Sequence, residues 1–263
     1  MCAALLALAW MAAPGRAQED VYDVLGKALM PIANVFALNP GDVTSGTDAA
    51  SPAPGHALVL DAHLVAASKL PPQLQGQAVH VALMTPDKLL VRAPIAGQIL
   101  TVCRDGDTLW ATPGSRLQAL MNQAAAEATP GKKKKKHAAR ILGPLVLPVP
   151  QKELVFLPIL FQVADAGDDT VGTTTCMMLD VQLLEQLSKS LHGENWTARL
   201  WVGPDYQIMR IALKGPEWSG TISIDKLAFS PSLPDGTFQA QGTDVLTLTA
   251  REFLDLLSRF GSK

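Results

Sequence analysis

Histidine, cysteine and carboxylate side chains are the groups in this sequence whose chemistry would serve a metal site or acid–base catalysis. None of the five histidines stands at a zinc-ligand spacing from another histidine or from a cysteine. These histidines are His56, His63, His80, His137 and His192. Asp105 and Asp107 flank Gly106, and a hairpin turn explains this arrangement more simply than a pair of catalytic carboxylates.

Other signatures of catalysis are also missing from the sequence. It contains no Gly-x-Ser-x-Gly elbow and no glycine-rich phosphate loop. Acids and bases that are distant in sequence can still assemble in a fold, so an enzyme stays an open alternative. We predict a protein that is not an enzyme and that holds no metal or cofactor.

The N-terminal segment has features of an export signal. Residues 3–13 form an apolar run that is followed by a Pro-Gly-Arg-Ala sequence ending at Ala17. The run is shorter than the roughly 20 residues that a transmembrane helix needs. We expect a signal peptide over 1–17, cut after Ala17, and a periplasmic product. The basic residues that usually precede such a run are missing, so an apolar N-terminus without this role is the alternative.

Two cysteines, Cys103 and Cys176, follow the predicted signal peptide, and both lie in strand-like runs. In an oxidising compartment the pair is compatible with one disulfide, which would stabilise the fold by up to about 4 kcal/mol. Two separate buried thiols are the other interpretation, because free cysteine packs as a small apolar side chain. Connectivity is not encoded in one sequence, and both interpretations stay open.

The overall charge argues against nucleic acid as a partner. The formal net charge is −2, whereas a protein that binds a duplex would have a broad basic surface. The local exception is a run of five lysines, Lys132, Lys133, Lys134, Lys135 and Lys136. Such a run is typical of a solvated loop. A second interpretation is contact with anionic lipid headgroups, at about 1 kcal/mol per basic residue.

The alternating apolar runs and the turn residues of 77–113 predict four successive antiparallel strands. The segment 77–84 places valines and a leucine at alternate positions, and 88–92 alternates aliphatic with basic residues. Asp105-Gly106 supplies the pair that favours a two-residue hairpin loop. Aliphatic side chains must fill the core, since 48% of residues are hydrophobic and only 5% are aromatic.

The remaining elements follow from helical or alternating spacing. Helices are predicted over 19–36, where Pro31 kinks or splits the helix, over 115–127 with Ser115 as N-cap, after Asp180 as N-cap, and after a Thr249–Glu252 capping box. Further strands are predicted at 57–70, 161–164, 172–179, 196–202, 207–213 and 221–229, with a turn at 165–169. These elements predict an α+β protein with one long curved antiparallel sheet and helices on one side. Two domains divided at the lysine run are the weaker alternative.

Three segments lack regular periodicity. We predict flexible insertions at about 39–56 and 129–140. The segment 141–160 is apolar but is interrupted by four prolines, which exclude a regular helix and a central strand. It is interpreted either as a loop lying across a hydrophobic opening or as a connection that covers one edge of the core.

Three motifs in order resemble the LolA/LolB-like superfamily of periplasmic lipoprotein carriers and outer-membrane lipoprotein receptors. They are Met84 to Val91 (MTPDKLLV), Arg104 to Trp110 (RDGDTLW) and Leu233 to Phe238 (LPDGTF), and the resemblance covers most of 21–238. It implies a single domain over 18–263, built as an unclosed (half) antiparallel β-barrel of about ten strands with helices lidding the concave face. It also implies a hydrophobic cavity that accepts acyl chains. Carriers of this family have arginine where this chain has Thr85, so the resemblance indicates the fold better than dedicated lipoprotein transport.

We therefore predict an exported, non-enzymatic carrier of lipid, acyl chains or lipoproteins. The predicted cavity wall, called the wall residues below, consists of Val79, Val81, Leu83, Leu89, Val91, Leu100, Val102, Leu200, Met209, Ile211 and Leu213. An envelope protein-interaction or sensor module on the same fold, with a filled core, is the second prediction. The two differ in whether the concave face is an open cavity or is packed with side chains.

Overall fold

The computed structural model describes residues 20–38, 57–68, 75–95, 98–127, 142–190 and 196–253. The predicted signal peptide at 1–17, the insertions at 39–56 and 129–140, and the lysine run lie outside the described residues.

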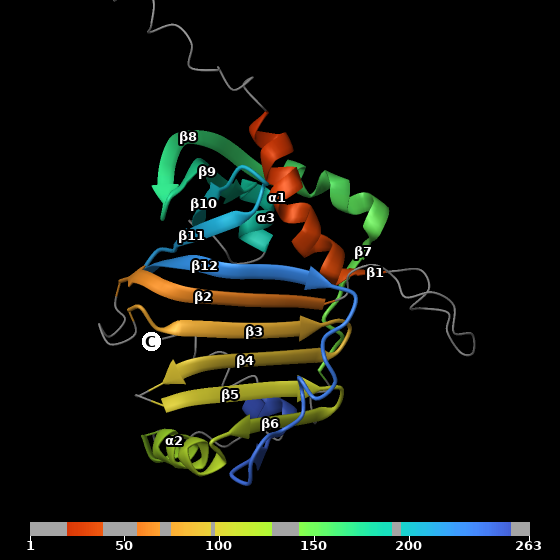
Figure 1. Cartoon of the computed structure of the whole chain (residues 1–263), viewed down its shortest axis with the longest axis vertical. Helices are drawn as coiled ribbons and strands as arrows, with labels where there is room; N and C mark the ends of the chain where they lie inside the picture. The colour runs from red at the N-terminus through yellow and green to blue at the C-terminus, as the bar shows by residue number, and fades with distance from the viewer. Residues whose placement is uncertain are drawn as a thin grey trace, which may run out of the picture.

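One sheet of antiparallel strands dominates the fold (Figure 1). Its strand order is β13-β6-β5-β4-β3-β2-β12-β11-β10-β9-β8. The bounds are β2 (Ala57–Ala67), β3 (Ala78–Met84), β4 (Lys88–Ile95), β5 (Gln98–Asp105), β6 (Thr108–Thr112), β8 (Phe161–Val171), β9 (Thr174–Leu183), β10 (Thr197–Val202), β11 (Ile208–Lys214), β12 (Ser219–Ser230) and β13 (Leu246–Thr247). A separate parallel pair joins β1 (Ala37–Leu38) to β7 (Leu147–Pro150).

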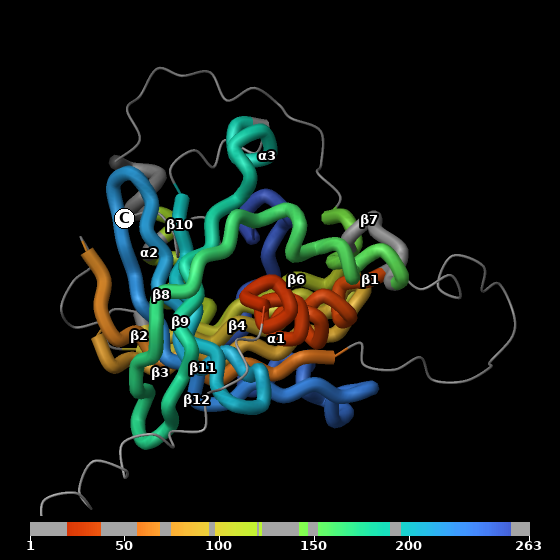
Figure 2. The backbone as a smooth tube through the Cα atoms, turned by 90° about the horizontal axis from the view of Figure 1, so that it is seen from above, coloured from red at the N-terminus to blue at the C-terminus, as the bar shows by residue number. Residues whose placement is uncertain are grey.

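The sheet is curved and open. The two ends of the strand order, β13 and β8, are different strands at opposite ends of the sheet, so the barrel does not close. Figure 2 shows the β8–β9 end of the sheet turned up beside α1 (Val21–Phe36), so that the sheet curves around this helix. The other helices are α2 (Gly114–Glu127), η2 (a 3-10 helix, Gln151–Leu160) and α3 (Glu185–Ser190). The predicted α+β half-barrel is confirmed.

Helix α1 packs one apolar stripe onto the sheet. The carboxylate of Asp20 accepts a hydrogen bond from the backbone N–H of Tyr22 at 3.0 Å and so caps the first turn. Val24, Leu25 and Ala28 are buried against β9, β10, β11 and β12. The helix continues through Pro31, so of the two outcomes predicted for this proline, division into two helices is wrong.

The C-terminal end of α1 is held by a side chain of the β3–β4 turn. The buried hydroxyl of Thr85 donates a hydrogen bond to the carbonyl of Val35 at 3.0 Å. This carbonyl lies in the last turn of the helix, where no intrahelical N–H is available to it. The N–H of Leu145 donates to the carbonyl of Pro86, which is next to Thr85. One turn therefore holds both α1 and the segment that leads to β7.

The four strands predicted over 77–113 are confirmed as β3 to β6. Gly106 adopts a φ of +61° in the β5–β6 turn, as the Asp-Gly pair predicted. The ammonium of Lys88 lies 2.8 Å from the carboxylate of Asp105 across β4 and β5. The hydrogen bond to Asp105 raises the pKa of Lys88.

The β8–β9 hairpin turns later than predicted. The sequence placed the turn at 165–169, but β8 continues to Val171 and the chain turns at Gly172, whose φ is +61°. The aspartate-rich segment instead forms a bulge in β8 between Asp165 and Asp168. A bulge absorbs turn-forming residues without ending the strand, which explains the error.

Two predicted helix caps are corrected as well. Asp180 lies within β9 and does not cap a helix, since α3 begins at Glu185. Ser115 is not the N-cap of α2. Its N–H and hydroxyl donate to the carboxylate of Asp244 at 2.7 and 2.6 Å, and these bonds, the hydroxyl first, lower the pKa of Asp244. Asp244, distant in sequence, therefore satisfies the start of α2.

The capping box at Thr249 is confirmed. The carboxylate of Glu252 accepts hydrogen bonds from the N–H and hydroxyl of Thr249, both at 2.8 Å. The N–H of Glu252 donates back to the hydroxyl of Thr249 at 3.3 Å. The helical turn that follows places Phe253 against α2 and β5.

Cys103 and Cys176 are both thiols without a disulfide, and they are buried in separate apolar clusters. Cys103 packs with Trp110 and Phe238 on the sheet face opposite α1, and Cys176 packs with Trp201. Of the two interpretations of these cysteines, separate buried thiols agree with the structure. Burial raises the pKa of the Cys103 thiol to about 12.

The first prediction concerns thiol reactivity. We expect Cys103 and Cys176 to resist a disulfide reagent such as DTNB in the native protein at pH 8, because both are buried and Cys103 stays protonated. Unfolding in urea should make both react. Rapid labelling of native protein, or fewer than two free thiols in the unfolded, unreduced chain, would contradict this expectation.

The same pKa has a consequence for stability. The native pKa of about 12 exceeds the ordinary value of 9.0, so deprotonation of Cys103 favours the unfolded chain between these values. The contribution of this thiol to stability is therefore complete below pH 9 and is lost as the pH rises toward 12.

The second prediction concerns Thr85. Thr85→Val keeps the shape of the side chain but leaves the Val35 carbonyl without this donor, and should lower the free energy of unfolding by about 1–2 kcal/mol. Thr112→Val removes an exposed hydroxyl bond to the Asp244 carbonyl and should cost less than about 0.5 kcal/mol. Urea unfolding measures both variants, and equal losses would contradict a special role for the buried bond.

Candidate functional site

Ten of the eleven wall residues share the sheet face on which α1 packs. Leu83 and Leu89 pack with Val35 of α1, and Leu200 and Ile211 pack with its buried stripe. Strand alternation and register then place the others on the same face. These others are Val79, Val81, Val91, Leu100, Val102 and Leu213.

Met209 lies on the opposite face. It packs against the cluster that contains Trp201 and Cys176. The register shifts between Trp201 and Val202, so that Val202 pairs with Ile208 and Trp201 with Arg210. Met209 is the extra residue of this bulge, and the alternation on which its prediction rested changes there.

Four of the ten wall residues on this face are packed at its two ends. At one end Leu83 and Leu89 lie against Val35, Phe36 and Leu145. At the other end Leu100 and Val102 lie against Leu117 of α2 and against Leu248 and Phe253. Side chains from α1, the 142–145 segment, α2 and the 248–253 segment therefore fill both ends.

The middle of the face is less covered. One row of apolar residues crosses β2 to β6 in register, from Leu60 through Val81, Val91 and Val102 to Ala111. Leu60 packs against the α1 cluster, and Val102 and Ala111 are buried. Val81 and Val91 are partly exposed, as is neighbouring Val79. None of these three valines belongs to an apolar cluster of the described residues, and we call them the apolar strip.

Arg104 is a buried cation on this apolar face. Its side chain is part of the row Leu89, Arg104, Leu109, and it is only 5% exposed. The guanidinium donates to the carbonyls of Gly143 at 2.7 Å, Gly106 at 3.1 Å and Leu142 at 3.4 Å. Backbone carbonyls thus satisfy this buried cation. The result is a fixed cover of residues 142–145 beside the apolar strip.

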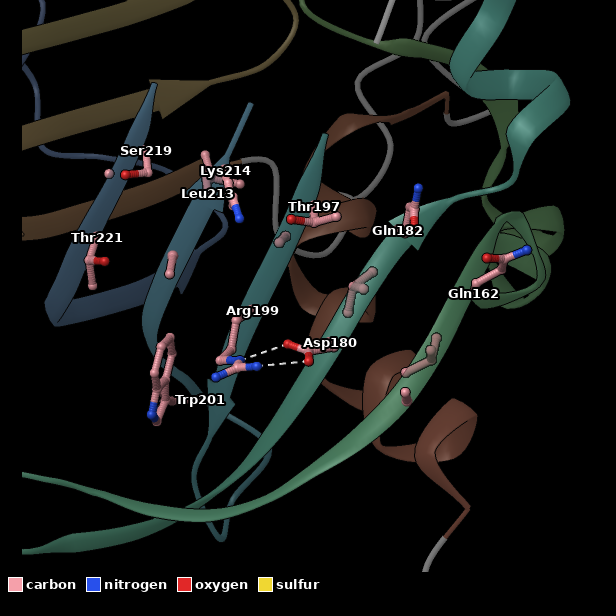
Figure 3. Close-up of a pocket in the computed structure, with 16 residues that line it drawn as sticks. Gln162, Asp180, Gln182, Thr197, Arg199, Trp201, Leu213, Lys214, Ser219 and Thr221 are labelled. Atoms are coloured by element: carbon pink, nitrogen blue, oxygen red, sulfur yellow. Dashed lines mark hydrogen bonds and ion pairs between the residues drawn. The ribbon is translucent and has the colours of Figure 1, made fainter. Parts of the chain in front are cut away.

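Two pockets stand out among the described residues, and the larger of these, of about 660 Å³, lies on the other side of the β8–β12 half of the sheet (Figure 3). Arg199 and Trp201, which line it, alternate with Leu200, which packs toward α1. Polar residues that line it are Gln162, Asp180, Gln182, Thr197, Arg199, Lys214, Ser219 and Thr221. Of the wall residues, only Leu213 lines either pocket.

The ion pair in this pocket is already complete. The guanidinium of Arg199 donates to both carboxylate oxygens of Asp180 at 2.7 and 2.8 Å. This bond lowers the pKa of Asp180, and both residues are about half exposed. The lining is mixed, since this matched ion pair stands among apolar residues such as Val163, Val181 and Leu213.

The smaller pocket, of about 370 Å³, is on the face opposite α1. Met84, Lys88 and Asp105 line it together with residues 233–236 and 238–239. It contains the Lys88–Asp105 ion pair and borders Phe238. It shares no residue with the predicted wall.

The described residues contain neither a metal-binding cluster nor a helix that could span a membrane. No group of three or more His, Cys, Asp or Glu side chains there is arranged to hold a metal ion. No described helix is long and apolar enough to cross a membrane. His63 and His80 instead pair with carboxylates, Asp225 at 2.9 Å and Asp61 at 2.6 Å.

Several solved structures are similar to this chain at low sequence identity. The lipoprotein LppX of Mycobacterium tuberculosis is 8% identical, with a TM-score of 0.40 over 81% of this chain and 97% of that chain. The Pseudomonas aeruginosa MucA/MucB complex matches at 11% identity and a TM-score of 0.39. That match covers 88% of this chain but only 64% of the other, so this chain spans less than two thirds of it.

A LolA superfamily protein of Nitrosomonas europaea matches at 10% identity and a TM-score of 0.27, over 84% of this chain and 97% of that chain. No protein-family model and no curated protein matches the sequence.

Sequence reasoning singled out Thr85 but missed Arg104. Thr85 was noted because carriers of the resembled family have arginine at this position, and the structure shows its hydroxyl holding the end of α1. Arg104 had a signal in the sequence, since it has the parity of Leu100 and Val102 on β5. Two of its three carbonyl partners, Leu142 and Gly143, lie 38 and 39 positions later in a segment without periodicity. No spacing rule connects Arg104 to these two partners.

The third prediction tests Arg104 as the anchor of the cover. Arg104→Met removes the donor to three carbonyls and should lower the free energy of unfolding by about 2–3 kcal/mol. Hydrogen exchange at the Leu145 amide, which donates to Pro86, should also become faster. Arg92→Met changes an exposed arginine of β4 and should alter neither quantity appreciably. Unchanged exchange at Leu145 in Arg104→Met would contradict the assignment.

Proposed function

We propose that this protein is a non-enzymatic carrier or binding protein that holds a lipid or acyl chain against the apolar strip. The observation that carries the proposal is the cross-strand row that is buried at Val102 and Ala111 but partly exposed at Val81 and Val91, which belong to no apolar cluster of the described residues. A folded sheet normally buries such a central apolar position. An apolar chain laid there would remove the valines from water and gain the corresponding hydrophobic free energy.

The surroundings of the strip support an apolar ligand over a polar one. The row in which it lies is apolar from Leu60 to Ala111. Arg104, the nearby cation, already donates to three carbonyls and is not offered to a ligand. Specificity would therefore come from shape and apolar contact, as is usual for pockets that bind acyl chains.

The proposal includes export to the periplasm and a membrane partner. Export is inferred from the apolar run at residues 3–13 and from the Pro-Gly-Arg-Ala sequence that follows it and ends at Ala17. The five lysines at 132–136 are proposed to contact anionic lipid headgroups, since a basic run gains about 1 kcal/mol per residue near such a surface. Lipoproteins remain within the ligand class, because their acyl chains offer the same apolar surface.

A second candidate function is an envelope protein-interaction or sensor module. The observation that favours it is β8, which in the described part of the chain has a strand neighbour on one side only and exposes most of its side chains. An unpaired strand edge offers main-chain donors and acceptors to another strand. If this second function holds, the apolar residues packed at both ends of the sheet face under α1 form an ordinary hydrophobic core and do not bind a ligand.

The fourth prediction tests the apolar strip. The protein should bind a fluorescent fatty acid, and unlabelled fatty acid should displace it. Val81→Asp with Val91→Asp should weaken this binding about tenfold or more, because the ligand would have to desolvate carboxylates.

Val65→Asp is the matched control. Val65 is 40% exposed at a bulge of β2, outside the strip, and its replacement should leave fatty-acid binding unchanged. Urea unfolding shows that each variant is folded. No fatty-acid binding by the unaltered protein would overturn the proposal, and lipid-free capture of one envelope protein would then select the second candidate.

A further inference from the structure

Helix η2 is apolar on two sides, and only one of them is used by the fold. Leu154 is fully buried against Ala33 and Ala37, and the ring of Pro158 packs beside Gly26 of α1. The other side exposes Val155, Phe156 and Ile159 by 58%, 60% and 61%. Figure 1 shows η2 as the green helix beside α1.

The exposed side continues onto the start of α1. Leu154 lies near the C-terminal end of α1 and Pro158 near Gly26, so η2 runs antiparallel to α1. Tyr22 is four residues before Gly26 and therefore lies on the same side of the helix. Tyr22 is 41% exposed. Four large side chains, three on η2 and one on α1, thus form one exposed surface, which we call the η2 surface.

We propose that the η2 surface docks the protein onto the interface of a lipid bilayer. Val155, Phe156 and Ile159 have no hydrogen-bonding atoms in their side chains, and the backbone of η2 bonds within the helix. A protein partner would typically make about one hydrogen bond per 100–200 Å² of interface, for which the hydroxyl of Tyr22 is the one side-chain group among the four residues of the η2 surface. The hydrocarbon of a bilayer has no hydrogen-bonding groups. It therefore favours a surface whose backbone groups are hydrogen-bonded within the protein and whose side chains are apolar.

Charge in the chain agrees with a lipid partner. Lys152 is exposed in the first turn of η2, where Glu153 is the helix's one acidic residue. In the sequence, η2 begins at Gln151, 15 positions after Lys136, the last residue of the lysine run. Stable attachment to a bilayer usually takes two signals, such as an apolar contact together with a basic segment. The η2 surface supplies the apolar contact, and this inference does not depend on the apolar strip.

The test is sedimentation with vesicles of phosphatidylglycerol and phosphatidylethanolamine. The unaltered protein should sediment with the vesicles, and Phe156→Ser with Ile159→Ser should reduce the partition coefficient about tenfold or more. The matched control is Ile99→Ser with Val65→Ser. Ile99 and Val65 are exposed by 62% and 40% but lie on the sheet away from η2, and their replacement should leave partitioning unchanged. No sedimentation of the unaltered protein, or equal sedimentation of the η2 variant, would overturn the proposal.

A site-specific probe gives a second readout. Phe156→Cys, combined with Cys2→Ser, can be labelled with the environment-sensitive dye NBD, because Cys103 and Cys176 are both buried. Its emission should rise on addition of vesicles, whereas NBD at Ile99→Cys should not respond. A second copy of this chain is the competing occupant. A dimer that Phe156→Ser with Ile159→Ser converts to monomer, seen by analytical ultracentrifugation together with no NBD response to vesicles, would overturn the proposal in favour of self-association.

Discussion

The structure depends on how the two faces of one open sheet are covered. Both faces of β3 to β6 bury apolar residues, with Leu90 and Cys103 on one face and Leu83 and Val102 on the other. Residues 233–245 contribute cover to the first face, and α1, residues 142–145 and α2 contribute cover to the second. In β9 and β10 the outer face is mixed. Asp180 and Arg199 form an exposed ion pair there, whereas Cys176 and Trp201 belong to a buried apolar cluster on the same face.

Polar contacts rather than regular packing fix the covers of the second face. Thr85 bonds the last turn of α1, and Arg104 bonds the carbonyls of residues 142 and 143. Asp244 plays the same part for α2 through Ser115. The Thr85 and Arg104 contacts satisfy buried or part-buried groups at a helix end or in an irregular segment, and the exposed Ser115–Asp244 contact satisfies the start of α2. The covers are thereby held at defined places, and the stretch between them is where the apolar strip is partly exposed.

The sequence predicted the fold well where the signal is local. Strands β3 to β6 follow from alternation and one Asp-Gly turn, and the Thr249 capping box follows from a spacing of three. It failed where a bulge changes the parity, as at Met209, and where a bulge accommodates turn residues, as between Asp165 and Asp168. Contacts between residues distant in sequence were not predicted, because no local spacing connects the two partners. Asp244 caps a helix 130 positions earlier, since 244 minus 114 is 130.

The apolar strip and the η2 surface meet different sides of α1. The stripe of Val24, Leu25 and Ala28 faces the sheet, whereas Gly26 faces Pro158 of η2. A bilayer in contact with η2 would therefore have α1 between it and the sheet. Passage of an acyl chain from the bilayer to the strip would require α1 to shift or the chain to go around it. The buried bond from Thr85 restrains the C-terminal end of α1, whereas in its N-terminal half the ammonium of Lys27 donates an exposed hydrogen bond to the hydroxyl of Tyr206 at 3.0 Å. Displacement of the N-terminal half, which carries Tyr22, therefore breaks an exposed polar contact, and displacement of the C-terminal end breaks a buried one.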